Sequence, residues 1–168
     1  KDVIAQGVEG VNAVVHLAAI ISYLPQDDEL VYSVNVQGAR NVFEAASRGA
    51  ASAAQIVFAS TDATYPSNSP LYRPVDENHP QNPTSPYGLS KVLGEQMAQY
   101  YARTASLSYT IARFSFTQAA HELIDPNGAF AHRIFFVNGR LRYLKQMGDD
   151  SPAAQESIAI LEKLAADD

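Results

Sequence analysis

Three short apolar runs alternate with helix-length stretches along the chain, and this alternation is the strongest restriction on its fold. The runs are residues 12–19, 55–59 and 108–114. Continuous apolar runs of this length, rich in β-branched residues, are typical of strands buried on both faces of a parallel sheet. Helical crossovers between parallel strands are right-handed. The pattern therefore predicts an α/β fold built as half of a doubly wound parallel sheet.

The first connecting stretch opens with acidic residues at positions 27–29, where the positive end of a helix dipole favours negative charge. Gly49 suits a left-handed helix stop, so we expect a helix from residue 27 to 47. A buried amide needs partners, so Asn35 either ties down a neighbouring loop or lies beneath an active site. The inward face is predicted to contain Val31, Asn35, Gly38, Val42 and Ala46.

The second connecting stretch contains a pair of reactive side chains. Ser85 suits a helix N-cap, and Pro86 suits the first helical position. Tyr87 and Lys91 then stand four residues apart on one face. A nearby ammonium lowers the pKa of a tyrosine from its usual value of about 10, so Tyr87 is suited to exchange a proton with a substrate hydroxyl or carbonyl. The alternative is a tyrosine at the edge of the core beside a solvated lysine.

The same helix has two further faces. Small residues continue the Tyr87 face and permit close approach of another surface, at Gly94, Ala98 and Ala102. That surface is either a partner helix or the chain's own sheet. A neighbouring stripe has the spacing of a core face and contains Leu89, Val92, Leu93, Met97, Tyr100 and Tyr101.

Polar residues follow the second apolar run. Residues 60–66 form a hydroxyl-rich cluster at the carboxyl end of a predicted strand, where open α/β sheets place ligand contacts. The alternative is a simple polar turn. The proline-rich segment 67–84 is expected to be an ordered, irregular loop, long enough to suggest a function. We interpret His16, which interrupts the first run, as a core histidine.

Composition excludes several kinds of partner and site. The 168 residues have a net charge of −6, which argues against nucleic acid or an anionic membrane as a partner. There is no cysteine, so neither a disulfide nor a thiolate metal site forms, and we expect no metal. No apolar run is long enough to span a bilayer, and no signal peptide opens the chain. A cytoplasmic location is expected.

The last third of the chain has a different character. Residues 129–144 are aromatic and basic, and Arg133 and Arg140 either meet a substrate diphosphate or form a solvated basic edge. Ser151 and Pro152 are expected to begin a last helix that reaches about residue 166. Its buried face is predicted to contain Ala154, Ile158, Leu161 and Ala165.

Five segments, in order, resemble motifs of the extended short-chain dehydrogenase/reductases, particularly the NAD-dependent epimerase/dehydratase family. They are Val15–Ala19, Asn35–Gly38, Phe58–Thr61, Pro74–Glu77 and Ser85–Lys91. The resemblance covers roughly residues 1–114. It implies a partial Rossmann-like NAD(P)-binding domain over 1–116 and a partial substrate-side region over 117–168.

The resemblance also implies roles for individual residues. Tyr87 would be the catalytic acid/base, and Lys91 would lower its pKa and bind the nicotinamide ribose of NAD or NADP. Thr61 would orient the reacting oxygen of the substrate, and Asn35 would support the cofactor side. The cofactor-binding residues would be Leu17, Ala18, Ala19, Asn35, Ala59, Tyr87, Lys91 and Phe114. Substrate contacts would come from Thr61, Asp62, Arg133 and Arg140.

The sequence departs from the family pattern at three places. It has no strand–GxGxxG–helix arrangement, so we expect the phosphate-binding half to lie upstream and this segment alone to be inactive and to bind NAD poorly. Ala63 replaces the Glu of family dehydratases, which disfavours dehydration although Asp62 remains. Phe116 stands where an Arg-x-x-Asn motif would place Asn, so the sugar-binding half departs from the pattern.

Three functions are compatible with these residues. The first is an NAD(P)-dependent epimerase or oxidoreductase that acts on a hydroxyl-bearing substrate, in particular a nucleotide sugar. The second is a simple reductase or hydroxysteroid-type dehydrogenase that uses the same residues. The third is a non-catalytic dinucleotide-binding sensor or scaffold. A homodimer through helices 30–47 and 86–104 is expected from the resemblance.

Overall fold

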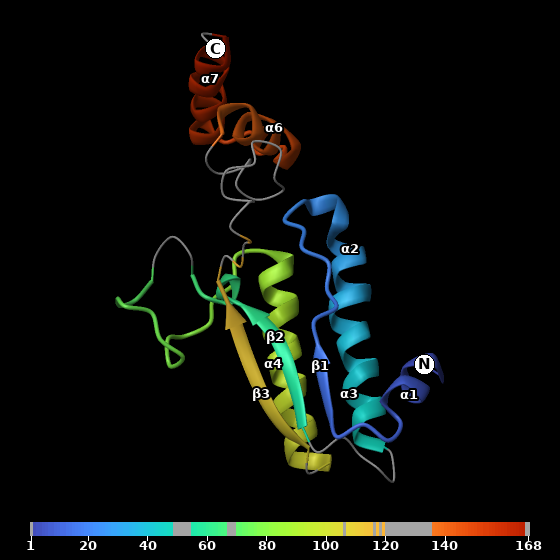
Figure 1. The fold of residues 1–168 in the computed structure, drawn as a ribbon. Coiled ribbons are helices and arrows are strands. Elements are labelled where there is room, and N and C mark those ends of the chain that lie inside the picture. The colour runs from blue at the N-terminus through green and yellow to red at the C-terminus, as the bar shows by residue number, and fades with distance from the viewer. Residues whose placement is uncertain are drawn as a thin grey trace. The chain divides into compact units, whose positions relative to one another are not determined.

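The computed structural model describes residues 2–48, 55–66, 70–105, 107–115, 117, 119 and 136–166. The chain divides into two compact units, Lys1–Ser115 and Phe116–Asp168, and each is described by itself. Figure 1 shows the path of the chain.

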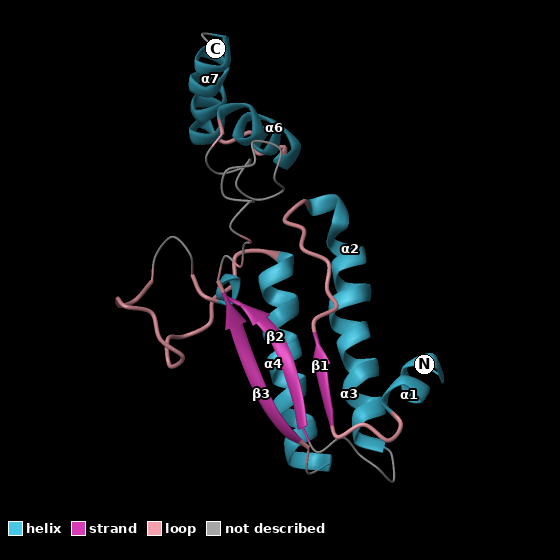
Figure 2. Cartoon of the chain, in the orientation of Figure 1, coloured by secondary structure: helices cyan, strands magenta, loops and turns pink. Residues whose placement is uncertain are grey.

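The first unit contains a three-stranded parallel sheet in the order β1-β2-β3. The strands are β1 (Ala13–His16), β2 (Gln55–Thr61) and β3 (Ser108–Phe114). In register, Val14 of β1 lies beside Ile56 of β2, and Phe58 of β2 lies beside Ile111 of β3. Figure 2 shows the strands running in the same direction. Along the chain, helices connect each strand to the next. The predicted α/β fold with a parallel sheet is confirmed.

Helices connect and cover these strands. The short helix α1 (Asp2–Val8) precedes β1. A 3-10 turn at Pro25–Asp27 leads into α2 (Asp28–Val31), the π-helical segment Tyr32–Gln37 and α3 (Gly38–Arg48), which follow one another without a break. After β2 and a 3-10 turn at Asp62–Thr64, α4 (Pro86–Ala105) leads to β3. Both predicted connecting helices are therefore present.

The π-helical segment changes which residues of the first connecting helix face inward. The expected inward residues included Gly38 and Val42, but the buried residues after the π segment are Ala39, Phe43 and Ala46. A π turn contains one more residue than an α turn, which accounts for the burial of Ala39 and Phe43 next to the half-buried Gly38 and Val42. Val31, Asn35 and Ala46 are buried as predicted.

The hydrophobic core lies between the sheet and helices α3 and α4. It is built from Ala39, Phe43, Ala46, Ile56, Phe58, Ala98 and Leu107. The opposite face is different, since Val15 is 60% exposed and Leu17, just after β1, is 65% exposed. The expectation of strands buried on both faces is therefore wrong for the described residues, because α3 and α4 both contribute to the core on one face.

Helix α4 also buries a different face from the one predicted. Its buried residues are Tyr87, Gly88, Ser90, Lys91, Gly94, Glu95 and Ala98. In the stripe expected to form the core, Met97 and Tyr101 are partly buried and pack against the core, but Leu89 is 39% exposed and Tyr100 is 52% exposed. Gly94 explains the difference, because a Cβ there would lie 2.2 Å from the Phe58 ring. The small residues thus pack on the chain's own sheet, and this draws the polar side chains of the same face into the interior.

The second unit contains helices α6 (Val137–Met147) and α7 (Pro152–Ala166). Gly148, at φ 63°, ends α6 in the left-handed conformation. The Ser151 hydroxyl accepts a hydrogen bond from the Ala154 amide at 3.3 Å, so the predicted cap of the last helix is confirmed. The four residues predicted for its buried face are half-buried. Among the described residues, none of the helices combines the length and the apolar character needed to cross a membrane.

Candidate active site

Tyr87 lies in the first turn of α4, at the carboxyl end of the sheet. The Ser85 hydroxyl caps this turn by accepting a hydrogen bond from the Gly88 amide at 3.1 Å. The Tyr87 side chain is 6% exposed, and the Thr61 side chain lies close enough to its phenol to act on the pKa of Tyr87 in the lowering direction. The ring of Tyr23 meets the Tyr87 ring edge-on, with centroids 5.8 Å apart. The two hydroxyl groups assigned to catalysis by resemblance are therefore in contact.

Lys91 lies one helical turn further along and is also buried. Its ammonium donates a hydrogen bond of 2.8 Å to the Ala59 carbonyl and lies 5.8 Å from the centre of the Tyr87 ring. It also lies over the Phe58 ring, 5.2 Å from the centroid. Burial lowers the pKa of Lys91 to about 8. Lys91 thus joins α4 to β2 directly beneath the tyrosine.

The pKa of Tyr87 differs from the sequence-based expectation. Burial raises it, the hydrogen bond with Thr61 acts in the lowering direction, and the charge of Asp62 raises it further, so the net direction is upward. The expected lowering by Lys91 is therefore wrong for this arrangement. The reason is geometric, because the Lys91 ammonium lies over the face of the ring and gives its hydrogen bond to a backbone carbonyl.

Asn35 links the helix that contains it to two other segments. Its amide oxygen accepts a hydrogen bond from the Ile20 amide at 2.8 Å, and its amide nitrogen donates to the Ile20 carbonyl at 2.9 Å. The same nitrogen donates to the Ser90 hydroxyl at 3.0 Å, which in turn donates to the Tyr87 carbonyl at 2.7 Å. The structure confirms that Asn35 ties down a loop, and Ser90 links it to the backbone of Tyr87. It does so from the π-helical segment, a feature often found at functional sites.

The hydroxyl cluster after β2 forms a capped turn that is part of the same site. The Thr61 hydroxyl accepts a hydrogen bond from the Ala63 amide at 3.2 Å and donates to Asp62 at 3.2 Å. The Thr64 hydroxyl donates to the Thr61 carbonyl at 2.9 Å. The polar-turn interpretation is therefore confirmed, and a ligand contact at these residues stays a prediction.

The remaining predicted cofactor residues lie at the carboxyl ends of neighbouring strands. Leu17, Ala18 and Ala19 follow directly after β1, and Phe114 ends β3 beside Thr61 in the ladder. Leu17 and Phe114 are exposed, at 65% and 51%. His16 is buried against Phe58, with ring centroids 5.7 Å apart, and burial followed by the charge of Lys91 lowers its pKa. This position at the strand ends is where open α/β sheets bind ligands.

The two predicted diphosphate-binding cations belong to the second unit of the chain. Arg133 lies outside the described residues. Arg140 is exposed on α6, in the second unit, with its guanidinium 5.7 Å from the Tyr143 ring centre. Exposure of Arg140, Arg142 and Lys145 agrees with the solvated basic edge.

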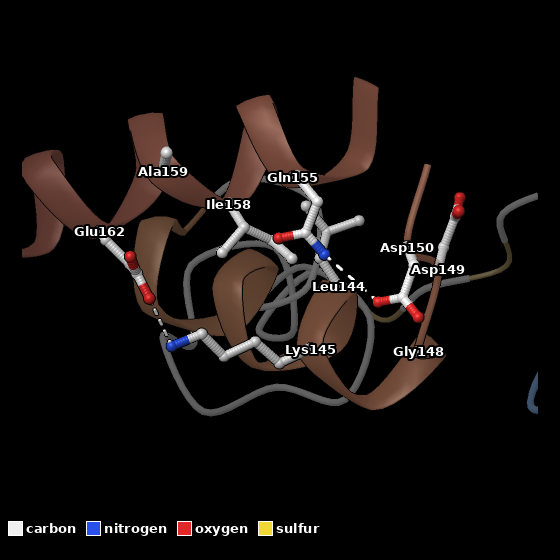
Figure 3. A pocket seen from close by; sticks show the side chains of 9 residues that line it. All are labelled: Leu144, Lys145, Gly148, Asp149, Asp150, Gln155, Ile158, Ala159 and Glu162. Atoms are coloured by element: carbon white, nitrogen blue, oxygen red, sulfur yellow. Dashed lines mark hydrogen bonds and ion pairs between the residues drawn. The ribbon is translucent and has the colours of Figure 1, made fainter. Parts of the chain in front are cut away.

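A separate open pocket of about 360 Å³ lies between α6 and α7 (Figure 3). Its walls include the Lys145–Glu162 ion pair at 2.7 Å and the acidic residues Asp149 and Asp150. None of the predicted site residues lines it. In the part of the chain that the structure describes, no group of three or more His, Asp or Glu is placed to hold a metal ion.

Two charged residues near the site, the buried Glu95 and the half-buried Arg113, were missed in the sequence. Glu95 is fully buried, and Arg113 forms an ion pair with it at 2.7 Å. Glu95 follows Tyr87 and Lys91 at the same four-residue spacing, and this repeated spacing is the signal that would have found it. Its partner Arg113 lies on another strand, so the sequence gives no local sign of the pairing.

The parallel sheet, its connecting helices and the Tyr87–Lys91–Thr61 group at the strand ends define a Rossmann-like α/β protein of the short-chain dehydrogenase/reductase type. The model of the NAD dependent epimerase/dehydratase family matches residues 1–142, and the chain belongs to this family. The resemblance seen in the five sequence segments is thereby confirmed.

The sequence is similar to enzymes that act on sugars or sugar nucleotides. The chain is 38% identical, over 135 residues, to a putative UDP-glucose 4-epimerase of Methanocaldococcus jannaschii, an alignment that covers 79% of the chain and 42% of the relative. It is 36% identical to L-arabinose 1-dehydrogenase (NAD(P)(+)) of Haloferax volcanii, with 73% and 52% covered. The chain thus spans about half the length of these relatives.

Solved structures give the same result. A short-chain dehydrogenase/reductase superfamily protein from Agrobacterium tumefaciens, with bound NAD, superimposes with a TM-score of 0.84 at 38% identity. That match covers 99% of the chain and 48% of the other protein. UDP-glucose 4-epimerase from Brucella ovis, in complex with NAD, matches with a TM-score of 0.60 at 30% identity and covers 67% and 34%.

Proposed function

We propose that this chain supplies the proton-transfer half of an NAD-dependent sugar-nucleotide epimerase. The observation that carries the proposal is the contact between the Tyr87 phenol and the Thr61 side chain, with the Lys91 ammonium beneath the same ring. The named epimerases among its relatives support a nucleotide sugar, such as UDP-glucose, as the substrate. A polypeptide of residues 1–168 alone is expected to be inactive.

The described residues fit the nicotinamide end of NAD. Lys91 and Tyr87 present a donor and a phenol side by side, and Leu17 and Phe114 offer exposed apolar surface at the same strand ends. The chain offers no GxGxxG turn for the pyrophosphate. If bound there, NAD would supply the redox chemistry, as acceptor and donor of a hydride at the substrate carbon. Leu17, Ala18, Ala19, Ala59 and Phe114 would border it, and Asn35 would hold the Ile20 loop beside it.

In this proposal Tyr87 moves the proton and Thr61 positions the substrate. As the tyrosinate, Tyr87 takes the proton of a substrate hydroxyl and becomes the phenol, which later returns that proton, while the Thr61 hydroxyl hydrogen-bonds the reacting oxygen. Lys91 would bind the nicotinamide ribose of the cofactor, since its ammonium does not lower the pKa of Tyr87. Asp62 is close enough to Tyr87 for its charge to oppose a negative charge on the phenol oxygen. Ala63 contributes no acid for elimination of water.

A dehydrogenase or reductase is the second candidate. The relationship to an L-arabinose 1-dehydrogenase favours it, because that enzyme's name specifies oxidation without epimerisation. The same Tyr87, Lys91 and Thr61 would serve both reactions. A non-catalytic sensor has no use for a phenol held against a second hydroxyl.

The test is Tyr87→Phe in the complete protein, with Tyr109→Phe, which alters an exposed tyrosine on β3, as the matched control. UDP-glucose is the first substrate to assay, with and without trapping of a ketone product to separate epimerase from dehydrogenase. Tyr87→Phe is expected to lower kcat by about 10²–10⁴-fold and to leave NAD bound. Unchanged turnover would reject the acid/base role and favour the sensor.

The quaternary structure and location are further parts of the proposal. A homodimer through residues 30–47 and 86–104 is supported by apolar side chains exposed on these helices, at Leu30, Leu89 and Tyr100. The absence of cysteine is compatible with the cytoplasm.

Light scattering on the complete protein tests the dimer. A dimer mass is expected for the wild type, and Leu89→Glu together with Tyr100→Glu is expected to give the monomer mass. A wild-type monomer, or a variant that remains fully dimeric, would reject this interface.

A further inference from the structure

The Glu95 carboxylate is the most highly connected buried charge in the described residues. It is fully buried, and it accepts hydrogen bonds from Ser60 at 2.5 Å, from Gln81 at 2.8 Å and from Arg113 at 2.9 and 2.7 Å. A buried carboxylate is costly unless it is paired and hydrogen-bonded, and here both oxygens have two donors each. The proton-transfer roles assigned above make no use of it.

Arg113 extends this network to the loop before α4. Its Nε and one terminal nitrogen donate hydrogen bonds to the Glu95 carboxylate. Its other terminal nitrogen donates to the Tyr65 hydroxyl at 2.6 Å and to the Glu77 carbonyl at 3.2 Å. With Gln81 bound to Glu95, the loop is attached to the ion pair at three points. Four separate segments therefore meet at one buried carboxylate, namely α4, β3, the end of β2 and the loop.

The network reaches the site through Ser60. Ser60 directly precedes Thr61 on β2, and Glu95 lies two helical turns after Tyr87 on α4. At the other side of the Tyr87–Thr61 contact, α4 and the turn after β2 also touch, because a Cβ on Gly88 would lie 2.3 Å from the Ala63 carbonyl oxygen. The contact between the two hydroxyl side chains therefore lies between two points at which α4 is fixed to β2.

We propose that Glu95 and Arg113 are positioning residues for the reaction, because they hold the end of β2 at the place where Thr61 meets Tyr87 and attach the loop of residues 77–81 to the same point. The inference rests on the proposed function and adds to it a group that never touches the substrate. The ion pair also keeps Glu95 ionised. Burial acts to raise the pKa of Glu95, but the hydrogen bonds from Arg113 and Ser60 outweigh burial and lower it.

The experiment is a double-mutant cycle in the complete protein, assayed with UDP-glucose. Ser60→Ala removes one hydrogen bond between Glu95 and the strand end but leaves the ion pair intact. Ser157→Ala is the matched control, because it removes a serine hydrogen bond at an exposed site in α7. Ser60→Ala is expected to lower kcat by about ten-fold with KM within about two-fold, since small misplacements of catalytic groups reduce the chemical step. Ser157→Ala is expected to behave as the wild type.

The decisive comparison is Ser60→Ala in a Thr61→Val background. If Ser60 acts through Thr61, the double variant is no slower than Thr61→Val alone. Equal losses in both backgrounds, or a KM effect without a kcat effect, would overturn the inference. Glu95→Gln is expected to show the same loss of kcat, and if it does not fold, the Ser60→Ala cycle decides by itself.

Failure of this inference differs from failure of the proposed function. If Tyr87→Phe is inactive while Ser60→Ala has wild-type kcat, only the positioning role is rejected. If Tyr87→Phe turns over normally, the acid/base role and the positioning role are both rejected.

Discussion

At the scale of single residues, Lys91 shows the strongest opposition between burial and charge. Its side chain is 4% exposed, and one backbone carbonyl is the hydrogen-bond acceptor of its ammonium. Burial lowers its pKa from 10.5 to about 8. The folded protein therefore releases this proton at a lower pH than the unfolded chain does, and stability must depend on pH as a result.

The sign of that dependence is testable. Between pH 8 and 10.5 the unfolded chain binds a proton at Lys91 that the folded protein has lost, so folding becomes more favourable as pH rises. The gain is about 2–3 kcal/mol over this window. In urea denaturation of the complete protein, the stability of the wild type relative to Lys91→Met should rise from pH 8 to pH 10.5. A constant difference across this range would contradict the buried lysine.

At the scale of elements, two helical glycines differ in their surroundings: Gly94 is closely packed, and Gly38 is not. Gly94 presses α4 onto the Phe58 ring, which is itself 2% exposed and packed against Phe43 and His16, so the ring has no room to move. Gly38, at the start of α3, has no atom within 4 Å of the position where a Cβ would be. Alanine favours a helix over glycine by about 1 kcal/mol.

The two glycines should therefore respond oppositely to alanine. Gly94→Ala is expected to destabilise the protein by about 1–3 kcal/mol, because overpacking outweighs propensity. Gly38→Ala is expected to leave stability unchanged or to increase it by up to about 1 kcal/mol. Chemical denaturation of the two variants measures both effects, and a stabilised Gly94→Ala would contradict the packing of α4 on β2.

The same elements show how far sequence reasoning reaches. The capped start of α4 and the Tyr87–Lys91 spacing are local patterns, and the structure has both. On the inward face of α3, Ala46 is buried as predicted, but Gly38 and Val42 were each one residue out, because a π turn has no sequence signature comparable to a cap or a proline. The Glu95–Arg113 pair was missed because it joins residues on different elements, and periodicity reports only on one element at a time.

At the scale of the whole molecule, the residues of the site gather at one end of the sheet, but a pyrophosphate cradle is not encoded in the sequence. A polypeptide of residues 1–168 is therefore expected to bind NAD weakly, with a Kd above about 1 mM, because under the proposed function Lys91, Tyr87 and the exposed apolar residues would contact only the nicotinamide end. Isothermal titration calorimetry with NAD measures this directly. Micromolar binding would show that some other part of the chain holds the phosphates.

The strand order β1-β2-β3 places β2 in the centre of the described sheet. Thr61 and the Lys91 acceptor Ala59 belong to β2, which is laddered on both sides and so keeps its position regardless of what joins the outer strands. Additional strands beside β1 or β3 would widen the sheet without altering the spacing of the reacting groups. The proposed catalytic residue Thr61 therefore lies on the central strand of the described sheet, and any further strands would join its edges.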